Sequence, residues 1–404
     1  MINIAVLGYG TVGSGVVEVI RTNGQIIDKN AGQNINVKYV LDLREFPGDP
    51  VMDILVHDYD VILNDPEVEV IAEVMGGVEP AYTFVKSALE KGKSVCTSNK
   101  ELVAKHGPEL LRIAAAHNRN FLFEASVGGG IPIIRPLNNA ITADKINSIT
   151  GILNGTTNYI LTKMCKEGLD FDAVLKEAQE LGYAERNPSA DVDGFDACRK
   201  IAILCSLAYG KNVNYENIYT EGITKITDID FKYANKLGRS VKLFGKAEHT
   251  EEQFYVFVTP VMIDDTHPLF SVNGVFNAIL VNGNVLGDVM FYGSGAGKLP
   301  TASAVVSDIV DAVRNINHNI PVEWSAEELE LSDIRSSKKR FFVRLSGDTQ
   351  ARAEDVKAAF GDVEFISVEG VENEFAFITD IISEADYEEK ASKLNGIITR
   401  IRME

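Results

Sequence analysis

The chain has 404 residues, enough for two or three domains, and its apolar content is ordinary for a protein that buries a sizeable core. Its formal net charge of −19 argues against non-specific binding to nucleic acid or to an anionic membrane. The amino terminus has neither the positive charge nor the long apolar run of a signal peptide, and no apolar stretch is long enough to cross a bilayer, so we expect a cytoplasmic protein.

The first 130 residues alternate short apolar runs with helical patterns. Apolar runs without polar alternation are typical of strands buried on both faces of a parallel sheet. The alternation therefore predicts a doubly wound α/β domain. Strands are predicted at residues 2–7, 37–41, 70–74, 94–97 and 121–123, and helices at residues 81–90 and 108–117.

The pattern changes after about residue 130 and predicts an α+β domain. Residues 131–157 read as strand and loop, and the third of the helices that follow is nearly all apolar after Lys200. A later helix at residues 303–315 has alanine, valine and isoleucine at helical spacing. The other elements predicted here are helices at residues 158–167, 171–181 and 194–209 and strands at residues 254–261 and 277–281.

The last part of the chain predicts a small separate unit. Residues 318–339 are polar and mixed, as in a linker. The order of elements beyond them is βαββαβ, which is typical of a ferredoxin-like fold. The strands are predicted at residues 340–345, 363–368, 374–379 and 397–402, and the helices at residues 353–360 and 385–394.

A glycine-rich turn directly after the first strand predicts a dinucleotide site. Gly8, Gly10 and Gly13 form G-x-G-x-x-G, which lets the chain turn, lets backbone approach a pyrophosphate and lets helix pack on strand. The helix that starts at this turn, with Thr11 and Val12, offers free N–H groups and a positive dipole end to phosphates. The alternative is a tight turn that binds nothing.

The second strand ends at Asp42, close to Arg44, and these two residues bear on the preference for NAD or NADP. Asp42 can accept hydrogen bonds from the ribose 2′-OH, which favours NAD. It lies farther downstream than usual, because we expect a polar loop at residues 22–36. Arg44 could face the 2′-phosphate of NADP instead, and both could be solvated loop charges.

Two later strand ends carry further candidate residues, at the edge where α/β sheets bind ligands. Gly76 and Gly77 follow one strand and let backbone approach the nicotinamide ribose. Thr97 ends the next strand, and Lys100 lies at its tip. Taken alone, Lys100 is as readily a surface lysine.

The strongest chemical signal is an acid–base pair at the start of an apolar helix. Asp196 and Lys200 are four residues apart, so they share a helix face, with the acid on the amino-terminal side. Because the following turns lack a polar face, we expect the lysine to be partly desolvated rather than part of an exposed pair. An ammonium oriented in this way can protonate a carbonyl oxygen as hydride arrives.

Charged and hydroxylated segments near this pair predict a small amino acid as the substrate. Glu185, Asp191 and Asp193 add negative charge that suits an ammonium, although a polar loop explains them too. The glycines and hydroxyls of residues 151–157 could present backbone N–H groups to a carboxylate. An ordinary turn is the alternative for that segment.

Several long motifs occur together along the chain. They are GYGTVG, EVMGG, TSNKELVA, EASVGGGIPII, GILNGTTNYI, GYAERNPSADVDGFDACRK and GSGAGKLPTASAVVSDI. On these motifs the chain resembles the homoserine dehydrogenases over essentially its full length. The family uses NAD or NADP to reduce aspartate 4-semialdehyde to homoserine, on the branch to threonine, methionine and isoleucine.

The resemblance implies roles for individual residues. Lys200 looks like the proton donor, with Asp196 positioning it or the substrate, and Lys100 looks like a second active-site lysine. Gly182 and Gly297 look like backbone contacts to the cofactor.

The resemblance also implies which residues hold the substrate. Glu185 and Asp191 look like ligands of the homoserine amino or hydroxyl group. Gly155 and Thr156 look like contacts to its other end.

A monovalent cation, Na⁺ or K⁺, is implied by the same resemblance. Its ligands would be Glu124 and the carbonyl groups of Val127, Gly129 and Ile131. The role of the ion would be structural. Glu124 could instead be an acid that caps the glycine loop.

The family further implies the domain plan and the assembly. A Rossmann-type domain comprises residues 1–130 and 296–317, a catalytic and dimerisation domain residues 131–295, a linker residues 318–339, and an ACT-like unit residues 340–404. We expect a homodimer or homotetramer. The D-x-P-G turn of ACT domains is absent, so an amino-acid effector at this unit and a purely structural role are equally expected.

Two other functions compete with this interpretation. An enzyme like aspartate-semialdehyde dehydrogenase needs a nucleophilic cysteine, and Cys96 is the only candidate, within an apolar strand where a thiol is unreactive. A non-catalytic regulator could sense NAD(P) and an amino acid. Lys100, Asp196 and Lys200 argue against it, because sensing needs no proton donor.

Overall fold

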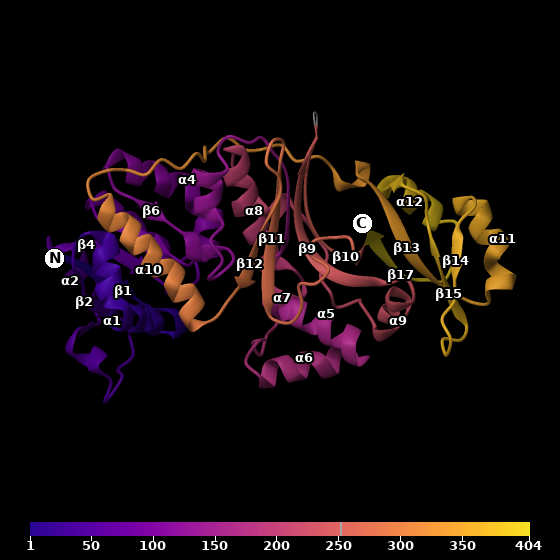
Figure 1. Ribbon diagram of the computed structural model, residues 1–404, viewed down its shortest axis with the longest axis horizontal. Coiled ribbons are helices and arrows are strands. Elements are labelled where there is room, and N and C mark those ends of the chain that lie inside the picture. The colour runs from indigo at the N-terminus through magenta and orange to yellow at the C-terminus, as the bar shows by residue number, and fades with distance from the viewer. Residues whose placement is uncertain (251–252) are drawn as a thin grey trace. The chain divides into compact units, whose positions relative to one another are not determined.

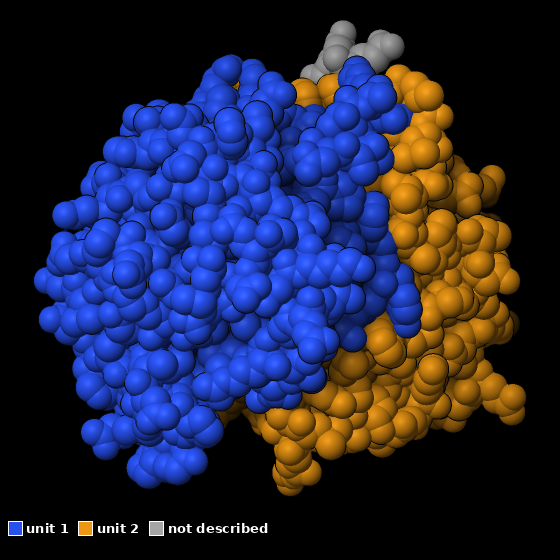
Figure 2. All heavy atoms as spheres, turned by 60° about the vertical axis from the view of Figure 1, so that its left-hand side comes forward, with its two compact units in different colours: residues 1–145, 202–215, 291–329 blue, residues 146–201, 216–290, 330–404 orange. Residues whose placement is uncertain are grey.

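The chain folds into two units, each assembled from three separate segments. The computed structural model describes residues 1–250 and 253–404 (Figure 1). Unit 1 contains residues 1–145, 202–215 and 291–329, and unit 2 contains residues 146–201, 216–290 and 330–404 (Figure 2). No helix in these described ranges is long and apolar enough to span a membrane.

Unit 1 is built on a parallel sheet, as predicted, and its six strands include Leu55–Val56, which the sequence analysis did not predict. The strand order is β3-β2-β1-β4-β5-β6, the doubly wound arrangement. The strands are β1 (Ile2–Leu7), β2 (Ile35–Leu41), β3 (Leu55–Val56), β4 (Val68–Glu73), β5 (Ser94–Thr97) and β6 (Phe121–Leu122). The helices are α1 (Thr11–Ala31), α2 (Tyr59–Leu63), α3 (Ala81–Glu90), α4 (Lys100–Ala116) and α10 (Lys298–Arg314).

The late helix α10 packs beside α1 (Figure 1). A Cβ atom on Gly15 of α1 would lie 2.8 Å from the carbonyl oxygen of Lys298, so a larger residue would push the helices apart. Apolar residues from both helices, such as Val16 and Ile309, are completely buried in one core with strand β1. A segment about 300 residues downstream therefore completes the first unit.

Helix α1 is longer than the sequence predicted. The prediction of a polar loop at residues 22–36 is wrong, because α1 continues to Ala31 with only a local departure from helical geometry at Asn23. Ile27 and Ala31 are buried in this second half, and most of its other side chains face solvent. A polar run on an exposed helix face looks like a loop in sequence.

Helix α4 also begins earlier than predicted. Its side-chain cap is Asn99, whose Oδ1 accepts a hydrogen bond from the N–H of Leu102 at 3.1 Å. Lys100, expected at a strand tip, is therefore the first residue of a helix. Pro108, where the sequence placed the helix start, lies inside α4.

Unit 2 contains a sheet of order β12-β11-β7-β9-β10-β17-β13-β15-β14. Strand β8 pairs with β10, and β16 pairs with β13. The strands are β7 (Ile146–Ile152), β8 (Tyr219–Thr220), β9 (Arg239–His249), β10 (Phe254–Asp264), β11 (Phe276–Gly283), β12 (Gly287–Ser294), β13 (Lys338–Ser346), β14 (Glu364–Ile366), β15 (Glu374–Ile378), β16 (Ile382–Ser383) and β17 (Ile397–Met403). The helices are α5 (Gly155–Glu167), α6 (Phe171–Glu180), α7 (Ser189–Val192), α8 (Phe195–Tyr209), α9 (Asp228–Lys236), α11 (Thr349–Phe360) and α12 (Glu384–Ala391). Residues 202–209 of α8 and residues 291–294 of β12 belong to unit 1.

The sequence missed β9, a central strand of this sheet. Lys242 and Lys246 break its apolar run, although both are buried. Lys246 pairs with Glu404 at 2.7 Å, so its charge is compensated. Lys242 instead donates from Nζ to the Val272 carbonyl at 2.6 Å and to Oδ1 of Asn273 at 2.9 Å. Burial lowers the pKa of Lys242 to about 8.

The carboxy-terminal elements follow the predicted βαββαβ order, and their strands continue the sheet of the middle region. Strand β17 pairs in parallel with β10 through Met262 and Met403. Buried ion pairs also join the two parts: Arg344 contacts Asp230 of α9 and Glu374 of β15, each at 2.8 Å. The last 75 residues therefore cluster with the middle region in unit 2.

The segment predicted as a linker is partly packed. It contains only one short 3₁₀ turn, Ile334–Ser336, before β13 begins at Lys338. Trp324 is 6% exposed. Its ring packs against Gly107 so closely that a Cβ atom on Gly107 would lie only 2.8 Å from a carbon of the ring. A buried tryptophan thus fixes this stretch to α4.

Replacing the buried lysine Lys242 with methionine should change how stability depends on pH. Because the unfolded chain binds this proton up to about pH 10.5 and the folded chain only to about 8, wild-type stability rises with pH between these values. The rise attributable to Lys242 is at most about 3 kcal/mol. Urea unfolding at pH 7.5, 9 and 10.5 should show it in wild type and not in Lys242→Met.

The exposed Lys393 offers a matched control. Lys393→Met should keep the wild-type pH profile. An unchanged profile in Lys242→Met would contradict the burial argument.

Candidate functional site

The glycine turn of unit 1 has the close contacts that a dinucleotide fold requires. Gly8 has φ of +96°, a conformation that residues with side chains rarely adopt. A Cβ atom on Gly13 would lie 1.9 Å from the carbonyl oxygen of Gly8, so only glycine fits there. Thr11 opens α1 directly after the turn, and Val12 is the second residue of that helix. The N–H groups of this first turn are free of intrahelical partners.

A cavity of about 480 Å³ opens beside this turn. Its lining joins the turn to the ends of the second and fourth strands. The lining residues include Gly8, Gly10, Asp42, Arg44, His57 and Met75. Its position at the carboxyl ends of parallel strands fits an adenosine half of a dinucleotide.

Asp42 is held by four N–H donors at the edge of this cavity. Its carboxylate accepts the N–H of Tyr9 at 2.8 Å and both the backbone and guanidinium N–H groups of Arg44 at 2.9–3.0 Å. The hydrogen bond from Arg44 holds the pKa of Asp42 well below its usual range. Asp42 is thus ionised, and Arg44 is turned toward it.

Glu73, which the sequence analysis did not single out, connects the end of β4 with the end of β5. Glu73 is completely buried, and its carboxylate accepts from the N–H of Met75 at 2.8 Å and from Oγ1 of Thr97 at 2.6 Å. Asn99 donates from Nδ2 to the carbonyl of Gly77 at 2.6 Å. Burial raises the pKa of Glu73.

These bonds place Gly76 and Lys100 relative to one another. Gly76 lies in the loop that Glu73 holds, with φ of +87°. Lys100 follows Asn99 at the start of α4. Only the acidic last residue of an apolar strand could have indicated Glu73 in the sequence.

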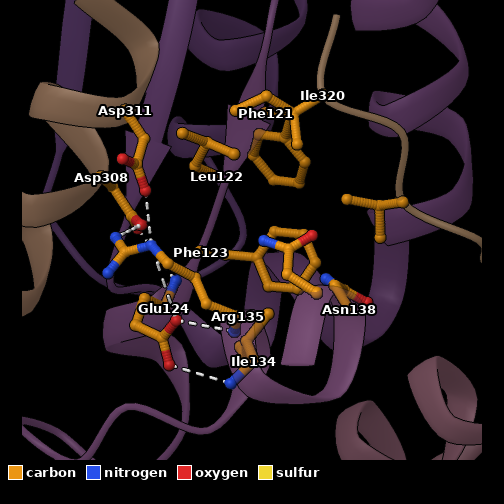
Figure 3. A pocket seen from close by; sticks show the side chains of 12 residues that line it. Phe121, Leu122, Phe123, Glu124, Ile134, Arg135, Asn138, Asp308, Asp311 and Ile320 are labelled. Atoms are coloured by element: carbon orange, nitrogen blue, oxygen red, sulfur yellow. Dashed lines mark hydrogen bonds and ion pairs between the residues drawn. The ribbon is translucent and has the colours of Figure 1, made fainter. Parts of the chain in front are cut away.

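The expected cation ligand Glu124 has another use in this structure (Figure 3). Its carboxylate accepts the backbone N–H groups of Ile133, Ile134 and Arg135 at 2.6–2.9 Å. Both oxygens face these donors, which is the arrangement that the capping alternative describes, and the cation assignment stays a prediction.

Arg135 extends this cluster to α10. Its guanidinium pairs with Asp308 and with Asp311, the latter at 2.6 Å (Figure 3). Oδ2 of Asp308 also accepts the N–H of Glu124 at 2.9 Å. The cluster therefore fixes the loop after β6 to the helix that completes unit 1.

In unit 2, Lys200 and Asp196 form the pair that the sequence predicted. Nζ of Lys200 lies 2.6 Å from Oδ2 of Asp196 and 2.8 Å from the carbonyl oxygen of Leu153. The side chains are only 12% and 8% exposed, so this is not a solvated surface pair. Two fixed acceptors, one carboxylate oxygen and one carbonyl oxygen, orient the ammonium.

Asn154 connects this pair to the neighbouring helix, and the sequence analysis did not single it out. Its Oδ1 accepts the N–H of Thr157 at 2.8 Å and so caps α5. Its Nδ2 donates to Asp191 at 2.7 Å and to Asp196 at 2.9 Å. One amide thus brings together the acid, the helix start and a candidate substrate ligand.

Of the other candidate residues in unit 2, Gly155 and Thr156 follow Asn154 directly, whereas Gly182 and Glu185 lie in an exposed loop. Gly155 and Thr156 form the first turn of α5, and Oγ1 of Thr156 donates to the carbonyl of Tyr183 at 2.6 Å. Glu185 is exposed, and no side-chain contact joins it to the pair in the described ranges. Gly182 has φ of +77° in the same exposed loop.

Two remaining residues belong to unit 1. Gly297 has φ of +120° and is the N-cap of α10. Cys96 is completely buried in β5, and burial raises the pKa of its thiol well above the usual value. A thiol without access or thiolate character cannot be the nucleophile that the competing semialdehyde dehydrogenase mechanism needs.

Two family models match the chain in succession. The model described as "Homoserine dehydrogenase, NAD binding domain" matches residues 8–124. The model described as "Homoserine dehydrogenase" matches residues 132–310. The first match includes the glycine turn and Asp42, and the second includes Asn154, Asp196 and Lys200.

Known proteins agree with the family models. A homoserine dehydrogenase of Bacillus subtilis is 38% identical over 98% of this chain and 95% of its own length. One of Synechocystis is 46% identical over 77% of this chain and 73% of its own. The crystal structure of a homoserine dehydrogenase from Thiobacillus denitrificans superposes with a TM-score of 0.91 at 35% identity, covering 100% of this chain and 98% of that one. The chain belongs to the homoserine dehydrogenase family.

Proposed function

We propose that this protein interconverts homoserine and aspartate 4-semialdehyde with NAD(H) or NADP(H), in the cytoplasm and on the route to threonine, methionine and isoleucine. The observation that carries the proposal is the buried ammonium of Lys200, fixed between Asp196 and the Leu153 carbonyl. A lysine held in this way is poised to give or take one proton, which a carbonyl–alcohol conversion requires.

In the reducing direction Lys200 supplies the proton. A bound nicotinamide would supply the hydride to the aldehyde carbon. The Nζ proton of Lys200 passes to the carbonyl oxygen, which becomes the hydroxyl. Asp196 accepts a hydrogen bond from Nζ before the transfer and from an N–H of the neutral amine after it. In the oxidising direction the neutral amine takes the hydroxyl proton. Lys100 is the proposed second lysine of the site.

The substrate contacts follow from the polar groups around the pair. The carboxylate of Asp191, already oriented by Asn154, suits the substrate ammonium together with Glu185. The free N–H groups of Gly155 and Thr156 suit the opposite, carboxylate end.

The cofactor contacts are proposed at the glycine turn and the strand ends. They comprise Gly8, Gly10, Thr11, Val12, Gly13, Asp42, Gly76, Thr97, Lys100, Gly182 and Gly297. We propose NAD as the better cofactor, because the ionised Asp42 accepts ribose hydroxyls and repels a 2′-phosphate. An archaeal homoserine dehydrogenase with TM-score 0.67 and 29% identity was solved with NADPH, so both cofactors belong in the test.

Assembly as a homodimer or homotetramer is part of the proposal. Strand β12 lies at the end of the sheet and exposes Met290, and Val285 is exposed in the turn before it. An apolar strand edge of this kind favours pairing with a second copy.

The carboxy-terminal residues 340–404 are proposed to brace the middle sheet. The shared pairing of β10 with β17 and the buried pairs of Arg344 support this role. An amino-acid effector at this ACT-like unit is the second candidate, and threonine added to the assay distinguishes the two. A structural Na⁺ or K⁺ held by Glu124 and the carbonyl groups of Val127, Gly129 and Ile131 is part of the proposal.

Removal of the Lys200 ammonium tests the proposed function. Lys200→Ala should lower kcat for homoserine oxidation at least about 10²-fold with little change in the Kd of NADH, because only the proton transfer is lost. Absorbance of the reduced nicotinamide and fluorescence titration measure the two quantities. The control is Lys163→Ala, which removes another lysine with an (i,i+4) acid and should keep kcat. Near-normal turnover of Lys200→Ala would refute the assignment.

Loss of the Asn154 amide should impair catalysis more than folding. Asn154→Ala removes a helix cap, about 1 kcal/mol of stability, and frees Asp196 from one of its partners. We expect kcat to fall about tenfold or more. Asp170→Ala removes the equivalent cap of α6 and should cost similar stability without lowering kcat. Equal kcat values for both variants would show that Asn154 acts only as a cap.

Replacing Asp42 should shift the cofactor preference. In Asp42→Ser the guanidinium of Arg44 loses its partner and can bind a 2′-phosphate. The ratio of kcat/KM with NAD to that with NADP should fall about tenfold or more. Adding Arg44→Ala to this variant should reverse the gain with NADP. A ratio that stays at the wild-type value would contradict the role of Asp42.

A further inference from the structure

A buried amide in unit 2 has no hydrogen-bond partner. Asn277, the second residue of β11, is 1% exposed. Neither its Nδ2 nor its Oδ1 meets a donor or acceptor in the part of the chain that the structure describes. Because an unpaired buried amide destabilises a fold, a native protein that keeps one needs a reason for it.

Asn277 lies close in the sheet to Leu153, whose carbonyl oxygen accepts a hydrogen bond from Lys200. The antiparallel ladder ends with Ala278 paired with Ile152, so Asn277 directly precedes this last pair on one strand and Leu153 directly follows it on the other. The carbonyl of Leu153 is one of the two acceptors that hold Nζ of Lys200. The unpaired amide is therefore one strand away from the residue that orients the proposed proton donor.

The amide also approaches the first turn of α5. A Cβ atom built on Gly155 would lie 3.5 Å from Oδ1 of Asn277 and only 2.8 Å from the carbonyl oxygen of Val275. A side chain at this position would therefore collide with the Val275 carbonyl and fill the space beside the amide, and glycine avoids both. The N–H groups of this turn have no acceptor within the helix.

Asn277 cannot easily move away from this turn. Asn158 of α5 donates from Nδ2 to the carbonyls of Val272 and Phe276 at 3.3 and 3.0 Å. These bonds tie the helix to the segment that leads into β11. The amide itself can still turn over, which exchanges Nδ2 and Oδ1 and breaks no hydrogen bond, since neither atom has one.

We propose that Asn277 is a substrate-binding residue whose Nδ2 donates to the carboxylate of the amino-acid substrate. The carboxylate docks against the N–H groups at the start of α5, and the amide of Asn277 supplies the side-chain donor beside them. This inference rests on the proposed function. It explains why the fold keeps a polar group where an aliphatic side chain would be more stable.

The test uses Asn277→Leu, which has a similar volume and no polar atom. A substrate-binding amide predicts opposite effects: a higher Tm, since the unpaired group is gone, and a KM for homoserine raised about tenfold or more, with the Kd of NADH unchanged. For the homoserine analogue in which a CH₂OH group replaces the carboxylate, the KM should be the same in wild type and in Asn277→Leu. Asn277→Asp, which places a negative charge there, should raise the KM for homoserine at least as much.

Thr259→Val is the matched control. Thr259 of β10 is also completely buried with an unpaired hydroxyl, and it belongs to no site described above. Thr259→Val should raise Tm and leave the KM for homoserine and the Kd of NADH unchanged. Folded Asn277→Leu with wild-type KM for homoserine, or an equal KM change for the analogue, would overturn the inference. A wild-type protein without homoserine turnover would instead refute the proposed function.

Discussion

The hydrogen bonds of one amide, Asn154, constrain the chemistry of unit 2. Its oxygen caps α5, and its nitrogen reaches two carboxylates, Asp191 and Asp196, at 2.7 and 2.9 Å. Asp196 in turn holds Lys200. Because an amide has a fixed planar geometry, the start of the helix and the two acids cannot shift independently. The ammonium is thus oriented before any ligand binds, which is the main requirement for efficient proton transfer.

Unit 1 uses buried carboxylates in a related way, as acceptors for backbone N–H groups. Glu73 holds the loop after β4 and the end of β5, and Glu124 holds the turn before Arg135. Each acid brings together segments that no regular ladder connects. A buried carboxylate is costly unless donors surround it, so these loops and acids stabilise one another. Substituting either acid leaves several backbone donors unpaired at once.

The sequence predicted those parts of the site whose residues are local. The glycine turn needs six consecutive residues, and Asp196 and Lys200 are one helical turn apart, so a short window contains the signal. Glu73 and Asn154 act through partners up to 42 positions away in the chain, and Asn277 lies near Gly155, which is 122 positions away. Nothing next to these residues in the sequence indicates these neighbours. Strand β9 was missed because buried lysines interrupt its pattern. The domain alternation and the βαββαβ order were predictable because each depends on the period of apolar residues alone.

The central claim is that Lys200 transfers the proton, and a crystal structure of the protein with homoserine and NAD⁺ tests it most directly. The account predicts Nζ of Lys200 within about 2.6–3.2 Å of the homoserine hydroxyl oxygen, with Asp196 still bound to the same nitrogen. A complex in which another side chain contacts that hydroxyl, while Lys200 stays on Asp196 and the Leu153 carbonyl and away from the substrate, would contradict it.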